Sequence, residues 1–150
     1  MIRWFAPLVV LCLMHAATAS AEEKRYYEDR SEIPVEKTWD LTALFESVDA
    51  WNAAFDELDG MLPKMEEYKG RLGESPEVLA EALAYQFDIA ERLDSIWVYS
   101  GQNKDTDTGN AAAQELYSRR AGLAARVSEA TAFVEPEIAA IPDDVLAKWR

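Results

Sequence analysis

The sequence predicts an all-α fold in which long antiparallel helices pack as a bundle or layer that is incomplete at the C-terminus. Apolar residues recur at spacings of three and four over most of residues 47–134, which is the period of one helix face. Helix start signals, such as Ser75 followed by Pro76, precede these stretches. No strand-like alternation and no repeat period interrupts them.

The N-terminal residues 1–21 are typical of a secretory signal peptide. Arg3 supplies the positive region, Trp4 to Met14 an apolar region, and Ala17-Thr18-Ala19 or Ala19-Ser20-Ala21 a cleavage site. The apolar run is about a dozen residues, shorter than the roughly 20 of a membrane-spanning helix. We therefore expect export to the periplasm or the extracellular space and no stable membrane insertion once the leader is removed. An uncleaved anchor stays open as the alternative.

Residues 22–32 are charged and irregular, so we expect a flexible linker, followed by a helical domain over residues 33–150. Pro34 favours extended backbone at Ile33, and Asp40 is placed to cap a short helical turn over Leu41 to Phe45.

The first long helix is expected to begin after Ser47 or Asp49, either of which suits an N-cap. Glycine costs about 1 kcal/mol and proline about 3 kcal/mol in a helix interior, so Gly60 and Pro63 predict a kink or break. The apolar face of this helix comprises Val48, Trp51, Phe55, Leu58 and Leu62, and the pattern resumes through Met65, Tyr68 and Leu72.

The second helix has the clearest start, with Ser75 as N-cap, Pro76 in the first position and Glu77 near the positive helix end. The expected main line of its apolar face is Leu79, Leu83, Gln86, Ala90, Leu93 and Trp97, widened by Val78, Ala82, Tyr85, Ile89 and Ile96.

A polar loop is expected over Gly101 to Asn110, with Asp107 or Thr108 capping the third helix. The third apolar face comprises Ala112, Leu116, Leu123, Val127, Ala130 and Val134. Pro136 is expected to bend or end that helix, and Pro142 to start another. That last helix stops at Arg150 without a C-cap glycine, which indicates a truncated chain.

Composition limits the chemistry of residues 22–150. The sole histidine, His15, and the sole cysteine, Cys12, lie in the predicted leader. A conventional zinc site or a nucleophile–histidine pair therefore has no ligands here, and disulfides are excluded. The formal charge of −13 disfavours nucleic acid and anionic lipid as partners.

The acidic groups of residues 22–150 are expected to be solvated and not to form a site. Asp105 to Asn110 superficially resembles a calcium loop, but the sixth and twelfth positions hold Asn110 and Leu116 in place of glycine and glutamate. A capped loop is therefore favoured over a weak calcium site. The pairs Glu66-Glu67, Glu135 with Glu137, and Asp143-Asp144 lack the apolar surroundings of an acid–base pair.

The basic and the aromatic side chains are expected to have structural roles. The basic residues Arg119, Arg120 and Arg126 are expected to pair with Glu115 and Glu129. Core packing is favoured over a ligand groove for the aromatic residues Trp39, Trp51, Tyr68, Tyr85, Trp97, Tyr99 and Tyr117. We predict no catalytic, cofactor-binding or metal-binding residue in this segment.

Several stretches resemble the oligoendopeptidase F family, zinc peptidases related to thimet oligopeptidase. The likeness starts in Arg30 to Phe45, including Thr38-Trp39-Asp40-Leu41, and continues in Tyr68 to Ser75, Asp105 to Asp107 and Phe133 to Ile138. It extends from Arg30 to the end of the sequence.

The resemblance implies the N-terminal, non-catalytic helical segment of an exported zinc metalloendopeptidase that hydrolyses oligopeptides. The zinc would be held by an H-E-x-x-H helix and a later glutamate in a C-terminal catalytic domain beyond Arg150, so this segment alone would be inactive. The segment would form part of the substrate-channel wall, and its acidity would favour basic or neutral peptides. The alternative is a stand-alone exported all-α binding or interaction module without peptidase activity.

Overall fold

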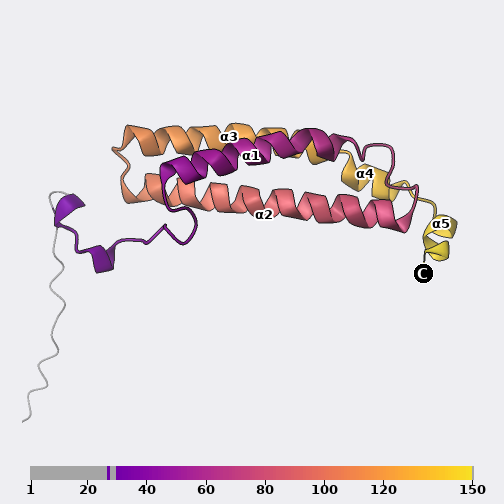
Figure 1. Ribbon diagram of the computed structural model, residues 1–150, viewed down its shortest axis with the longest axis horizontal. Helices are drawn as coiled ribbons and strands as arrows, with labels where there is room; N and C mark the ends of the chain where they lie inside the picture. Colours follow the sequence, from indigo (N-terminus) through magenta and orange to yellow (C-terminus); the bar gives the residue numbers. More distant parts are fainter. Residues whose placement is uncertain (1–26, 28–29, 150) are drawn as a thin grey trace, which may run out of the picture.

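The computed structural model describes Tyr27 and residues 30–149, and this part of the chain is helical with no strand. Three long helices lie side by side. Of the two short helices that follow, the first lies beside one end of them and the second lies beyond that end (Figure 1). The predicted all-α fold is confirmed. The elements are the 3-10 turns η1 (Arg30–Glu32) and η2 (Val35–Lys37) and the helices α1 (Val48–Glu66), α2 (Pro76–Thr106), α3 (Ala111–Thr131), α4 (Val134–Ala139) and α5 (Asp143–Lys148).

The predicted signal peptide, residues 1–21, lies outside the described residues. The same holds for most of the predicted linker at 22–32, of which the structure describes only Tyr27 and the turn η1.

Hydrogen bonds fix α1 and α2 as antiparallel neighbours. The Trp51 indole N–H, near the start of α1, donates to the Ile96 carbonyl in the second half of α2 at 3.0 Å. At the other end, the Tyr85 hydroxyl donates to the Met61 carbonyl at 3.1 Å. The indole N–H and the phenol O–H therefore each have an acceptor, which avoids the free-energy cost of a buried donor without a hydrogen bond.

The third helix runs parallel to α1 and antiparallel to α2. Arg119 donates to the Asn52 side chain, and one heptad later Arg126 pairs with Asp59, both at a sequence separation of 67. A constant separation means that the two helices keep one register along their contact.

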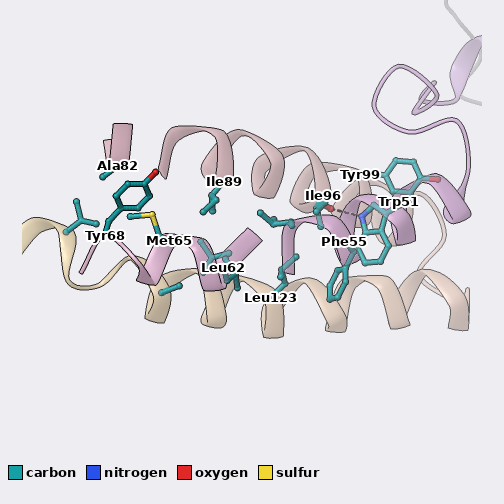
Figure 2. Packing of buried hydrophobic residues seen from close by; sticks show 14 of the residues in the cluster. Trp51, Phe55, Leu62, Met65, Tyr68, Ala82, Ile89, Ile96, Tyr99 and Leu123 are labelled. Carbon is teal, nitrogen blue, oxygen red and sulfur yellow. Dashed lines mark hydrogen bonds between the residues drawn. The ribbon is translucent and has the colours of Figure 1, made fainter. Parts of the chain in front are cut away.

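The core runs the length of the three long helices (Figure 2). Complete burial of a Leu or Ile side chain stabilises the fold by about 1.5–3 kcal/mol, so this seam supplies the main driving force. Its fully buried large side chains are Trp51, Leu58, Met65, Leu72, Ile89, Ile96 and Leu123.

The predicted helical turn after Asp40 is present. The Asp40 carboxylate accepts hydrogen bonds from the Thr42 hydroxyl at 2.6 Å and from its backbone N–H at 3.0 Å. These bonds hold the pKa of Asp40 below its usual value. The turn closes through the Phe45 N–H to the Leu41 carbonyl and directs Phe45 edge-on against the Tyr99 ring at 5.3 Å.

Of the kink or break predicted at Gly60 and Pro63, the break is wrong. The helix begins after Ser47, whose hydroxyl accepts from the Ala50 N–H, and continues through Gly60 and Pro63 to Glu66. Leu58, Leu62 and Met65 are buried on both sides of the interruption. Their burial outweighs a local cost of about 3–4 kcal/mol for one proline and one glycine.

The second helix starts as predicted, with the Ser75 hydroxyl accepting from the Val78 N–H. Its most buried line differs from the expected one. Ala82, Ile89 and Ile96 are fully buried, whereas Ala90 and Trp97 of the expected main line are exposed. The buried line of α2 is displaced from the expected one because this helix packs against both α1 and α3.

The predicted loop from Gly101 is also wrong, because α2 continues to Thr106. Asn103 and Thr106 turn their side chains back to carbonyls of their own helix, Tyr99 and Asn103 respectively. The N-cap of α3 is Asn110, which accepts from two backbone N–H groups, and neither predicted cap, Asp107 or Thr108, has that role.

The third helix ends at Thr131, before Pro136, which lies in the first turn of α4 where its missing N–H costs nothing. Ala112, which was expected on the buried face, is exposed, and its neighbour Ala113 is buried instead. Val134 is buried as expected. Pro142 precedes α5 as predicted. Within the described residues, no helix combines the length and apolarity needed to cross a bilayer.

Candidate functional site

The acidic pairs do not assemble into a site. Glu66 and Glu67 are exposed. The Glu137 carboxylate accepts the Gly70 N–H at 2.6 Å, which fixes the α1–α2 turn where Gly70 has φ +79°, and Asp144 pairs with Lys148 on its own helix. These carboxylates therefore face solvent or stabilise local structure.

The Asp105–Asn110 stretch is divided between two helix ends. Asp105 and Thr106 belong to the last turn of α2, and the Asp107 carboxylate accepts the Gly109 N–H at 3.1 Å. Asn110 uses its side-chain oxygen as the α3 cap. The side chains thus bond to nearby backbone groups.

The arginines of α3 find partners on other helices, so the predicted pairing with Glu115 and Glu129 is wrong. Arg126 reaches Asp59 on α1 at 2.7 Å, and Arg119 reaches Asn52 at 2.7 Å while lying over the Phe55 ring at 4.6 Å. A long side chain that spans to a neighbouring helix covers core surface as well as pairing its charge.

Arg120 is a buried cation between two aromatic rings. Its side chain is 6% exposed, and the guanidinium carbon lies 4.0 Å from the Trp97 ring centroid and 3.8 Å from that of Tyr117. One N–H donates to the Trp97 carbonyl, whereas Nε has no hydrogen-bond partner among the residues that the structure describes. Its space depends on Gly101, where a Cβ would lie 2.6 Å from Arg120 Nη1.

The sequence interpretation missed this arginine as a core residue. The available signal was its spacing, since Arg120 stands four residues after Leu116 and three before Leu123, on the buried line of α3.

The aromatic residues divide between core and surface. Trp51, Tyr68 and Tyr99 are buried, in agreement with the core assignment, whereas Trp39 is 65% exposed and Trp97 is 42% exposed. The Tyr68 hydroxyl donates to the Glu81 carboxylate at 2.7 Å. That bond and burial raise the pKa of Tyr68 to about 12.

A hollow with several apolar lining residues lies between α2 and the α3–α4 corner. It has a volume of about 580 Å³, and its lining includes Leu83, Thr131, Val134, Glu135 and Ile138. Such a groove suits an apolar side chain of another segment.

The described residues do not fit a zinc ion. They include no histidine and no cysteine, and no three acidic side chains among them gather at metal-binding distance. Zinc sites in proteins need at least three such ligands, so no catalytic step is assigned to this part of the chain.

Comparison with known proteins identifies relatives. Oligopeptidase PepF of Bacillus subtilis (strain 168) is 39% identical over 131 residues, covering 86% of this chain and 20% of the relative. The plasmid oligoendopeptidase F of Lactococcus lactis subsp. cremoris is 32% identical over 123 residues, covering 81% and 20%. The chain thus spans about one fifth of the length of these relatives. No family model matches the chain.

A solved structure agrees with these relatives. The crystal structure of oligoendopeptidase-F from Enterococcus faecium matches with a TM-score of 0.63 and 31% identity, over 69% of this chain and 20% of that chain. Sequence and backbone therefore lead to the same group of proteins.

Proposed function

We propose that this chain is the N-terminal, non-catalytic helical segment of an exported zinc metalloendopeptidase of the oligoendopeptidase F family, whose curated members it matches over about one fifth of their length. The observation that carries the proposal is the 39% identity over 131 residues to an oligopeptidase. The whole protein would hydrolyse oligopeptides.

The structure supports a wall or scaffold role for this segment. Three long helices pack side by side, each against the other two (Figure 1), with interhelical hydrogen bonds toward both ends of α1. Rigid helices suit a channel wall, because a wall must hold the substrate path open without taking part in the reaction. The zinc, its ligands and the catalytic groups would lie in the rest of the whole protein.

The test is peptide hydrolysis by the full-length gene product. We expect cleavage of a quenched fluorescent oligopeptide that a zinc chelator abolishes and added zinc restores, and no cleavage by residues 22–150 alone. Hydrolysis that persists in chelator would contradict the metal mechanism. A reading frame that encodes no H-E-x-x-H would favour the stand-alone interaction module.

Export is tested separately. The predicted leader, with Arg3 before its apolar run, supports it. N-terminal sequencing of protein recovered outside the cytoplasm should give Ser20 or Glu22 as the first residue. Retention of Met1 on a membrane-bound protein would favour the uncleaved anchor.

A further inference from the structure

The groove between α2 and the α3–α4 corner is bordered by apolar surface that the described elements leave exposed. Phe87 is 70% exposed and follows Leu83 of the groove by one helical turn. Val134, which is buried, and Ile138, which is half-buried, line the groove on its α4 side. A large exposed aromatic beside an apolar hollow marks an interaction surface.

The groove also carries a single acidic group. The Glu135 carboxylate lines it and has no hydrogen bond or ion pair within the described part of the chain. By contrast, Glu137, two residues later, is engaged with the Gly70 N–H. An occupant with one basic side chain beside an apolar one would match both features.

We propose that a helix from the remaining part of the peptidase docks in this groove, with an apolar side chain between Leu83 and Ile138 and a lysine or arginine toward Glu135. This proposal rests on the proposed function, since the relatives are about five times as long as the matched region. A second copy is disfavoured as the occupant because each chain carries a formal charge of −13.

Cysteine labelling of the full-length protein tests the docking. Ser128 lines the groove and Ser118 lies ten residues earlier on α3 outside it, and both are exposed in this segment. The variants Ser128→Cys and Ser118→Cys differ only in location. Maleimide labelling, read at each peptide by mass spectrometry, should be at least tenfold slower at position 128 than at position 118.

Each outcome decides the proposal. Equal labelling rates, or faster labelling at position 128, would overturn it. Protection at position 128 that disappears on dilution would assign the groove to a second copy and also overturn it. If the full-length protein shows no chelator-sensitive hydrolysis, the proposed function is contradicted, but the labelling ratio is unaffected. Failure of the docking proposal and failure of the proposed function are therefore distinguishable.

The charge of the occupant has its own test. In the Ser128→Cys background, Glu135→Lys should raise the labelling rate several-fold. The new lysine would repel the basic side chain of the docked helix and so weaken the docking that protects position 128. Glu115→Lys is the control, since Glu115 is exposed and lies outside the groove. Equal effects of the two substitutions would overturn the assignment of a basic contact.

Discussion

Arg120 occupies a position at which α3 otherwise buries apolar side chains. A buried charge without a carboxylate partner is costly. Here the cost is offset by the two aromatic faces of Trp97 and Tyr117 and by the Trp97 carbonyl. Glycine at position 101 leaves room for the guanidinium, because a Cβ there would lie 2.6 Å from Arg120 Nη1 and force that side chain to shift.

Gly101→Ala should therefore destabilise the fold, although alanine is the better helix former. We expect a loss of about 1–3 kcal/mol, since the new Cβ displaces a packed guanidinium. Gly60→Ala is the matched control, because nothing lies within 4 Å of a Cβ at position 60, and it should stabilise by up to about 1 kcal/mol. Urea unfolding followed by circular dichroism measures both, and a stabilising Gly101→Ala would contradict the contact.

Tyr68 links stability to alkaline pH. Its pKa is about 12 in the folded protein and about 10 in an unfolded chain, so the unfolded state releases the proton first. The stabilisation is complete below pH 10 and is lost as the pH rises from 10 to 12. Tyr68→Phe should weaken the protein at pH 7 and flatten this alkaline loss.

Ultraviolet titration provides the measurement for Tyr68. One tyrosine should resist ionisation at pH 11, and that tyrosine should disappear from the titration of Tyr68→Phe. Tyr85 also has a raised pKa, chiefly from burial, so the titration of the variant supplies the baseline. Ionisation of Tyr68 near pH 10 would refute the hydrogen bond to Glu81.

At the scale of the elements, local signals predicted starts better than continuations. Ser47 and Ser75 cap their helices as their side chains indicate. Pro63 did not end α1, because the cost of a proline is local while the burial that offsets it comes from residues distant in sequence. The polar residues after Gly101 remain helical without such burial, and Asn103 and Thr106 bond to carbonyls of their own helix.

The corrected cap of α3 gives a test at this scale. Asn110→Ala should destabilise by about 1 kcal/mol, because its side-chain oxygen satisfies two N–H groups of the first turn. Thr108→Ala is the control and should change stability by less than about 0.5 kcal/mol, since Thr108 contributes a backbone carbonyl to Gln114. A larger loss from Thr108→Ala would restore the cap predicted from sequence.

For the molecule as a whole, the resemblance noted in the sequence agrees with the relatives that the comparisons return, but the sequence did not locate a surface. The groove at Leu83 and Glu135 is formed by residues about 50 positions apart, and only the antiparallel pairing of α2 with α3 brings them together. No periodicity within one helix indicates such a meeting. The surface therefore required the fold.

The charge of the molecule leads to a prediction about substrates. A formal charge of −13 over 150 residues produces a negative potential that attracts cations and repels anions. If this segment lines the path of the peptide, a basic oligopeptide should have a several-fold higher kcat/KM than an acidic one with the same scissile sequence at low salt.

The salt dependence separates this field effect from specific contacts. At about 1 M salt the screening length falls to about 3 Å, so the ratio of basic to acidic kcat/KM should approach one, while a neutral peptide should change little. Matched peptides assayed with the full-length enzyme at both salt concentrations measure this. Equal rates at low salt would contradict the acidic wall, and a ratio that persists at high salt would indicate a direct contact between an enzyme side chain and the peptide.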